Sequence, residues 1–135
     1  MSDPTPDQLL SEARNARNKA ITPYSKYRVG AALLTGGGEI ISAGNIESST
    51  YGLTLCAERV ALFSALAQGY REFEGIAIAT ENLASPCGAC RQLLWEFAGN
   101  CTVYLTNGEG ETESYQLSAL FPRPFDDTNL SGEKS

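Results

Sequence analysis

Apolar and polar positions follow two different periods along the chain, and these periods separate helices from strands. Apolar residues recur at helical spacing in some stretches, whereas short apolar runs bounded by turn residues are typical of strands. The pattern predicts helices over 7–20, 55–68, 85–97 and 118–121, and strands over 27–34, 39–45, 75–80, 102–106 and 112–116.

Turn and capping residues mark the ends of these elements. Thr22-Pro23 stops the first helix, because the residue before a proline disfavours helical backbone. Three glycines at 36–38 predict a hairpin-like turn, and Gly69 ends the second helix. Ser85 and Pro86 are a preferred N-cap and first helical residue, so we expect the third helix to begin there.

Strands and helices alternate through the middle of the chain, which indicates a partly parallel sheet with helices on both faces. We therefore expect an α/β fold, a three-layer α/β/α domain with a five-stranded mixed sheet. A length of 135 residues suits one domain. We assign residues 1–130 to this domain and expect 131–135 to form a disordered tail.

The charge of the chain indicates which class of partner it binds. The chain has 16 acidic and 10 basic residues, a formal charge of −6, whereas polynucleotide binding requires a basic stripe. The nearest basic cluster, Arg14, Arg17 and Lys19, fits the solvated face of a short helix. A small ligand is favoured over a nucleic acid polymer.

The expected cellular location rests on two features that the sequence lacks, a membrane-spanning segment and a secretory signal. The apolar run at 60–67 is far shorter than the roughly 20 residues that cross a bilayer, so we expect no membrane part. The first seven residues are polar and acidic, unlike a secretory signal. We expect a cytoplasmic protein.

Four cysteines and no histidine restrict the chemistry. Histidine is the commonest general base and metal ligand, so proton transfer here must use a carboxylate, lysine, tyrosine or cysteine. An even cysteine number is compatible with disulfides, but a reducing compartment disfavours them. Any zinc site must rely on thiolates and carboxylates.

Two cysteine-containing segments lie at predicted helix starts, Cys56-Ala-Glu-Arg59 and Pro86-Cys-Gly-Ala-Cys-Arg-Gln92. The C-x-x-C pair of the second segment offers two ligands to one metal, although alone it also suits a redox dithiol. The first segment adds a third sulfur with Glu58 two residues later. A helix N-terminus lowers thiol pKa values and favours the thiolates that zinc requires.

Helix geometry sets a condition on this site. Residues two apart diverge by roughly 200° around a helix axis, so Cys56 and Glu58 do not share a helix face. They can address one metal if Cys56 stands at the very end of the helix, with the zinc above that end.

Two arginines follow the cysteines at spacings that return them to the same helix side, Arg59 after Cys56 and Arg91 after Cys87. Three thiolates and Zn²⁺ carry a net charge of −1, which makes a poor Lewis acid. Guanidinium donors to the sulfurs would restore acidity to a bound water. Three protein ligands leave an open fourth position, as catalytic zinc sites do.

The alternative is a closed structural site in which Cys101 is the fourth ligand. Cys101 begins a strand, where a small buried thiol is common, and it has no cysteine partner two to four residues away. We favour the open three-cysteine site.

At these residues the sequence resembles the zinc-dependent cytidine deaminases of the small homotetrameric type. The resemblance covers nearly the whole chain, and the shared segments occur in the same order: 23–33, 44–47, Tyr51-Gly52, 56–59 and 85–92. It implies one Zn²⁺ per subunit, bound by Cys56, Cys87 and Cys90. It also implies hydrolytic deamination of free cytidine and deoxycytidine in pyrimidine salvage, with zinc-bound hydroxide attacking C4.

The resemblance also assigns roles to individual residues. Glu58 would be the catalytic proton shuttle, and the backbone N–H of Ala57 would meet the pyrimidine 2-oxo group. Two residues, Asn45 and Glu47, would hold the ribose hydroxyls, although without the resemblance they suit a turn after a strand. The ring of Tyr27, where phenylalanine is usual, would lie beside the nucleoside.

The resemblance further implies a homotetramer with shared active sites. Phe125 would enter a neighbouring subunit's site, although without the resemblance it would be assigned to the core.

Three rival functions remain. A blasticidin S deaminase has similar length and zinc motifs, but Arg59 and the Asn45-Ile-Glu47 segment favour a nucleoside. A polynucleotide-editing deaminase is disfavoured by the acidic charge. A non-catalytic zinc-stabilised interaction domain predicts four sulfur ligands and no turnover.

Overall fold

The computed structural model describes residues 4–125, and the expected elements are present in it. The helices are α1 (Pro6–Ala16), η1 (Arg17–Lys19), η2 (Tyr51–Leu53), α2 (Ala57–Ala67), α3 (Gly88–Ala98) and α4 (Leu117–Leu120). The strands are β1 (Gly30–Thr35), β2 (Ile40–Gly44), β3 (Phe73–Ala79), β4 (Thr102–Thr106) and β5 (Thr112–Gln116). Residues 131–135, the expected tail, lie outside the described residues.

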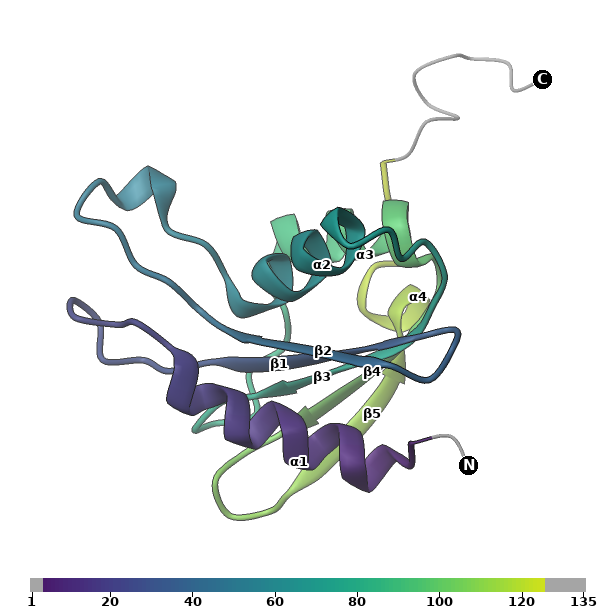
Figure 1. Cartoon of the computed structure of the whole chain (residues 1–135), viewed down its shortest axis with the longest axis horizontal. Helices are drawn as coiled ribbons and strands as arrows, with labels where there is room; N and C mark the ends of the chain where they lie inside the picture. The colour runs from purple at the N-terminus through teal and green to yellow at the C-terminus, as the bar shows by residue number, and fades with distance from the viewer. Residues whose placement is uncertain (1–3, 126–135) are drawn as a thin grey trace.

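The five strands form one mixed sheet in the order β2-β1-β3-β4-β5. The β3–β4 pair is parallel and the other three pairs are antiparallel. Helix α1 covers one face of the sheet, and α2 and α3 cover the other (Figure 1). The three-layer α/β/α prediction with a five-stranded mixed sheet is confirmed.

The two faces of the sheet have different packing. Along β3, Ile76 and Ile78 point into the larger core beneath α2 and α3, whereas Ala77 and Ala79 face α1. Alternation along a strand places these residues on opposite faces. The small alanines let α1 lie close to the sheet.

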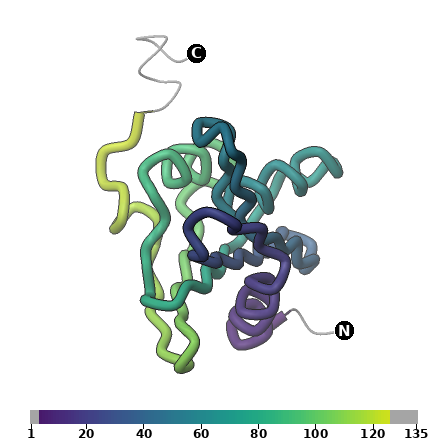
Figure 2. The backbone as a smooth tube through the Cα atoms, turned by 90° about the vertical axis from the view of Figure 1, so that its left-hand side faces the viewer, coloured from purple at the N-terminus to yellow at the C-terminus, as the bar shows by residue number. Residues whose placement is uncertain are grey.

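Two paired glycines let the backbone of α1 and η1 lie close to β1 and β2. Figure 2 views α1 end-on against the sheet. Gly30 and Gly44 are register partners in β1 and β2. A Cβ on Gly30 would stand 2.1 Å from the Ala13 carbonyl oxygen, and one on Gly44 would stand 2.4 Å from the Ala20 nitrogen. Glycine is therefore required where α1 and η1 cross this strand pair.

The predicted start of the third helix was wrong. Helix α3 begins at Gly88 with Cys87 as its N-cap, rather than at Pro86 with Ser85 as the cap. The Ser85 hydroxyl instead accepts a hydrogen bond from Arg91 Nη2 at 2.9 Å. The shift places Cys87 at the helix end itself.

Within residues 4–125, no helix is both long enough and apolar enough to cross a membrane.

Candidate active site

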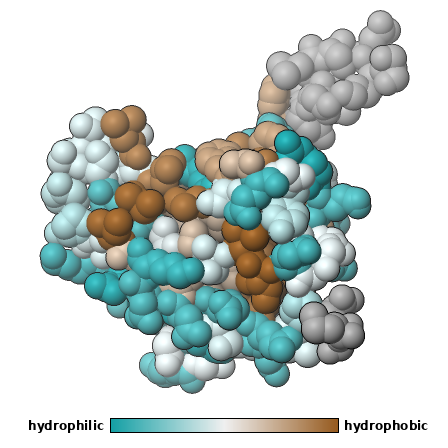
Figure 3. All heavy atoms as spheres, in the orientation of Figure 1, coloured by the Kyte–Doolittle hydropathy of each residue, from teal (hydrophilic) through white to brown (hydrophobic). Residues whose placement is uncertain are grey.

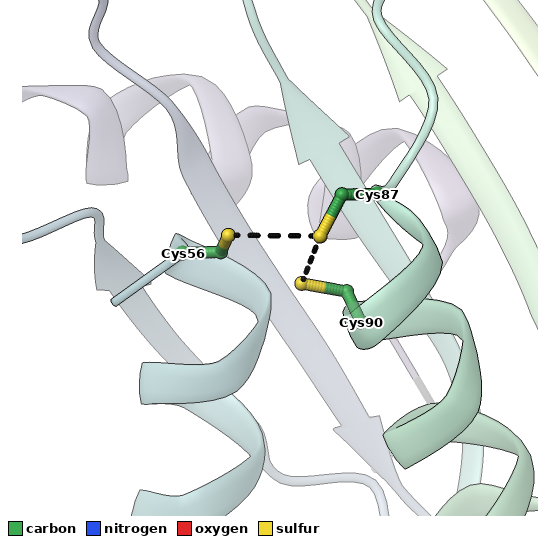
Figure 4. Close-up of side chains that lie close together, drawn as sticks. All are labelled: Cys56, Cys87 and Cys90. Atoms are coloured by element: carbon green, nitrogen blue, oxygen red, sulfur yellow. Dashed lines mark hydrogen bonds between the residues drawn. The ribbon is translucent and has the colours of Figure 1, made fainter. Parts of the chain in front are cut away.

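Three thiols meet at the N-termini of two helices (Figure 4). Cys56 is the N-cap of α2 and Cys87 the N-cap of α3, while Cys90 lies in the first turn of α3. The Cys56 and Cys87 sulfurs are 3.9 Å apart, and the Cys87 and Cys90 sulfurs are 3.4 Å apart. The geometric condition set by the sequence is met, because Cys56 precedes the first helical residue with extended backbone.

The spacing of the sulfurs fits a tetrahedral zinc ion. All three sulfurs lie within 4.8 Å of one another. A Zn–S bond of about 2.3 Å in a tetrahedron separates sulfurs by about 3.8 Å, close to the observed distances. The donor set therefore suits zinc, and three protein ligands leave one position for a water or substrate.

The surroundings make one of these thiols acidic. The pKa of Cys56 falls to about 5, because the Cys90 thiol and the Arg59 guanidinium donate toward its sulfur. Arg59 Nη2 lies 3.4 Å from that sulfur. The pKa of Cys90 is raised, by its hydrogen bonding with Cys56 and by burial. A thiolate is thus available to begin metal binding at neutral pH.

Cys101 lies apart from this cluster. It is not among the three cysteines whose sulfurs converge, and it packs in the core beneath α2 and α3. Burial raises the pKa of its thiol to about 11. The structure therefore does not form the closed four-cysteine site.

Glu58 is a buried carboxyl beside the metal cluster. It is the second residue of α2 and only 5% exposed, yet it lines the same pocket as Cys56 and Cys87. Burial raises its pKa to about 7, and the nearby Cys56 adds to this effect. A carboxyl with a pKa near neutrality can both accept and release a proton under physiological conditions.

The pocket next to the cluster has a volume of about 220 Å³. Tyr27 and Asn45, two of the predicted substrate contacts, contribute to its wall. Ala57 is buried at the first position of α2, where the N–H has no partner inside the helix. Other lining residues were not predicted to contact the substrate or the metal: Val29, Thr54, Leu55, Ile78, Thr80, Ala84 and Ser85.

Asn45 and Glu47 are held by the segment that precedes β1. Asn45 Oδ1 accepts from the Val29 N–H at 2.9 Å, and Asn45 Nδ2 donates to the Tyr27 carbonyl at 3.0 Å. Glu47 accepts from the Tyr24 and Ser25 N–H groups and from the Ser25 hydroxyl. These bonds lower the pKa of Glu47, with the Ser25 hydroxyl as the largest cause.

Glu47 lines an adjacent pocket rather than the one beside the cysteines. Its neighbours there are Tyr24, Ser25, Tyr51 and Thr54. Thr54 lines both pockets, so they adjoin. Ser25 was not predicted to be a site residue, because its partner Glu47 is 22 residues away in the sequence.

The structure directs Arg91 away from the sulfurs. Its Nη1 donates to the Leu120 carbonyl and its Nη2 to the Ser85 hydroxyl, both at 2.9 Å. Within the described part of the chain, the Nε atoms of Arg59 and Arg91 are buried without a hydrogen-bond partner. Arg91 thus joins α3 to the end of α4 and to the loop before Cys87.

Phe125 lies at the end of the described chain, on the segment after α4 that runs along the outside of the molecule (Figure 2). It is 54% exposed, and its carbonyl accepts a hydrogen bond from Gln92 Nε2. It is not among the residues that line the pocket of its own subunit.

Comparison with known proteins agrees with this geometry. Residues 4–106 match the family model described as the cytidine and deoxycytidylate deaminase zinc-binding region. A cytidine deaminase of Sporosarcina psychrophila is 46% identical over 93% of this chain and 94% of its own. A blasticidin-S deaminase of Bacillus cereus is 37% identical over 88% of this chain and 91% of its own.

A solved structure shares the fold. The crystal structure of a cytidine deaminase from Burkholderia pseudomallei superposes with a TM-score of 0.87 at 44% identity, covering 90% of this chain and 100% of that one. The matched region contains Cys56, Cys87 and Cys90, which form the zinc site. The chain therefore belongs to the zinc-binding family of cytidine and deoxycytidylate deaminases.

Proposed function

We propose that this protein hydrolyses the 4-amino group of free cytidine and deoxycytidine, giving uridine or deoxyuridine and ammonia. One observation carries the proposal: the buried Glu58 carboxyl shares a pocket with Cys56 and Cys87, beside a three-sulfur cluster with tetrahedral spacing. Deamination of this kind needs a metal-activated water and a single acid–base group in contact with the same ring.

The chemistry divides between the cluster and the carboxyl. Zinc bound by the three thiolates supplies a Lewis acid that makes water acidic near neutral pH. Glu58 takes a proton from the water that attacks C4 and delivers it to ring N3. It then carries the remaining hydroxyl proton to the 4-amino nitrogen. The C4–N4 bond breaks, ammonia leaves, and C4 becomes a carbonyl carbon.

Four groups are suited to hold the nucleoside. Asn45 uses one donor and one acceptor on backbone groups, so one amide hydrogen and one oxygen lone pair stay free for a ribose hydroxyl. Glu47, charged at neutral pH, would accept from a second hydroxyl. The Ala57 N–H would donate to the 2-oxo group, while the ring of Tyr27 forms a wall of the pocket.

Arg59 and Arg91 would support the zinc site without binding the metal. Arg59, which lies against the Cys56 sulfur, would draw charge from the thiolates. Arg91 would fix the loop that ends in Cys87, through its bond to Ser85.

We further propose a homotetramer with shared active sites. Support comes from large apolar side chains on the surface, including Tyr51 and Leu53 of η2 and Phe125. Figure 3 shows apolar residues at the surface around the projecting loop that contains η2. Such patches mark association surfaces, and Phe125 would enter a neighbour's pocket. The thiolate ligands suit the reducing cytoplasm.

Blasticidin S is the second candidate substrate, because the Bacillus cereus relative carries that name at 37% identity. The chemistry at the cytosine ring would be identical. A ribose-directed Asn45 and Glu47 favour the nucleoside, so the two substrates separate on the sugar side of the pocket.

The test is direct. Zinc-loaded protein is mixed in parallel with cytidine, deoxycytidine and blasticidin S, and deamination is followed by ultraviolet absorbance and ammonia release. We expect rapid conversion of both nucleosides and a kcat/KM for blasticidin S at least about 100-fold lower, because unpaired polar groups penalise the wrong ligand. Preferential turnover of blasticidin S would make it the substrate in place of the nucleosides. If none of the three compounds is turned over, the proposed deamination is refuted.

A further inference from the structure

The antiparallel ladder of β1 and β3 ends beside the pocket, at the register pair Gly30 and Ala79. Tyr27 stands three residues before Gly30, and Asn82 three residues after Ala79. The two residues therefore occupy opposed positions if the antiparallel register is continued. Their side chains meet there, with the Tyr27 hydroxyl 2.5 Å from Asn82 Oδ1.

Nearby backbone groups of the two segments are engaged elsewhere. The Asn45 amide binds the Tyr27 carbonyl and the Val29 N–H. On the other side, the Thr80 N–H donates to the Thr106 carbonyl of β4. Beyond the ladder, a bond between side chains thus connects two segments whose backbones are separately anchored.

The loop that carries Asn82 is tightly turned. The Thr80 hydroxyl oxygen accepts from the Ala84 N–H at 2.9 Å and from the Asn82 N–H at 3.4 Å. Between them Leu83 has a φ of 59°, a left-handed conformation that is unfavourable for a residue with a Cβ. A loop held in this conformation relaxes unless other contacts retain it.

The Tyr27–Asn82 bond joins two segments that each contribute residues to the pocket wall. Tyr27 lines it from the segment before β1, and Ala84, Ser85 and Cys87 line it from the loop. We propose that the Tyr27 hydroxyl and Asn82 form a latch that holds residues 80–87 and the Tyr27 ring in their binding positions. Tyr27 and Asn82 are then positioning residues for the nucleoside, an assignment that rests on the proposed function.

The latch acts on binding more than on chemistry. Neither side chain contacts the sulfurs or Glu58 through a hydrogen bond in the described structure. Breaking the bond frees the loop and the ring, and the substrate must then order them when it binds. KM should rise while kcat stays nearly constant.

A double-mutant cycle tests the latch. Tyr27→Phe keeps the ring and removes the hydroxyl, and Asn82→Ala removes the acceptor. Because Asn82 is exposed to water, we expect each change to raise KM for cytidine by about three- to tenfold, with kcat within about twofold and zinc content unchanged. The double variant should be no worse than the worse single variant. Unchanged KM values, or effects that multiply, overturn the latch.

A second measurement needs no substrate. Amide hydrogen exchange of residues 80–87 should accelerate in Tyr27→Phe and Asn82→Ala. It should not accelerate in Tyr104→Phe, because the Tyr104 side chain packs against the cluster on the α1 side of the sheet. If the wild type fails to deaminate cytidine, the proposed function fails, and this exchange still decides the latch. Unaltered exchange in both latch variants refutes it even in an active enzyme.

Discussion

At the scale of single residues, Glu58 and Cys56 lie in the same pocket but have pKa values shifted in opposite directions. Glu58 is buried with a pKa raised to about 7, whereas the pKa of Cys56 is lowered to about 5. Neighbouring groups whose pKa values are pushed in opposite directions take opposite roles. The thiolate is suited to bind a cation, and the carboxyl to exchange protons.

Replacing Glu58 with glutamine should separate proton transfer from metal binding. Glutamine has nearly the same shape but cannot take a proton, so kcat for cytidine should fall by about 10²–10⁴-fold. Metal analysis should find zinc at the wild-type level, because no sulfur is altered. Cys56→Ala, as the comparison variant, should lose zinc as well as activity. Near-normal turnover by Glu58→Gln would remove the shuttle role.

Cys101 provides a titratable thiol outside the metal site. Its pKa is about 11 in the folded protein and 9.0 for an ordinary thiol, so the native state favours the protonated form. The resulting stabilisation is complete below pH 9 and is lost as the pH rises from 9 to 11, by at most about 3 kcal/mol. Thermal unfolding should therefore show the advantage of wild type over Cys101→Ala shrinking between pH 8 and 10.5.

The same variant tests the ligand set. Cys101→Ala should retain full zinc occupancy, since its sulfur lies outside the cluster. A loss of zinc in Cys101→Ala would contradict this placement. So would a stability difference between wild type and Cys101→Ala that grows as the pH rises.

At the scale of elements, the close contact of α1 and η1 with the β1–β2 pair depends on glycine. In Gly30→Ala the new Cβ would stand 2.1 Å from the Ala13 carbonyl oxygen and 2.6 Å from the Arg17 nitrogen, both backbone atoms. We expect a loss of about 1–3 kcal/mol or more in the free energy of unfolding, measured by urea denaturation. Gly52→Ala, with no atom within 4 Å of the new Cβ, should change it by less than about 0.5 kcal/mol.

Local sequence signals predicted most of the elements and the centre of the site. The five strands follow from apolar runs bounded by turn residues, and β4 and β5 have the predicted bounds. The sulfur cluster was predictable because each cysteine segment is short and lies at a helix start. The start of α3 was missed because Ser85 binds Arg91 rather than capping the helix.

Partners distant in sequence were beyond this kind of inference. Asn82 meets Tyr27 across 55 residues, and that contact depends on the register of β1 against β3, which apolar patterning alone does not specify. The direction of Arg91 likewise depends on where α4 ends, because its Nη1 binds the Leu120 carbonyl. Contacts of this kind follow from tertiary packing.

At the scale of the whole molecule, the pocket of one chain is bordered by surfaces that a second chain could complete. Phe125 is exposed and lies outside its own pocket, while Tyr51 of η2 is 74% exposed beside the pocket that contains Glu47. Large aromatic side chains left in water favour association. Shared sites would then make activity a property of the assembly.

Subunit complementation tests shared sites. Glu58→Gln lacks the proton shuttle but keeps Phe125, whereas Phe125→Ala keeps the shuttle but lacks the donated ring. Each variant alone should be weakly active at cytidine concentrations below KM. Co-expressed with different affinity tags and purified through both, they should regain about a quarter of wild-type activity, because random pairing unites an intact Glu58 with a donated Phe125 in that fraction of sites. Mixing the variants after separate purification is the control. If the co-expressed protein is no more active than the average of the two variants, each chain carries its site alone and Phe125 serves only its own subunit.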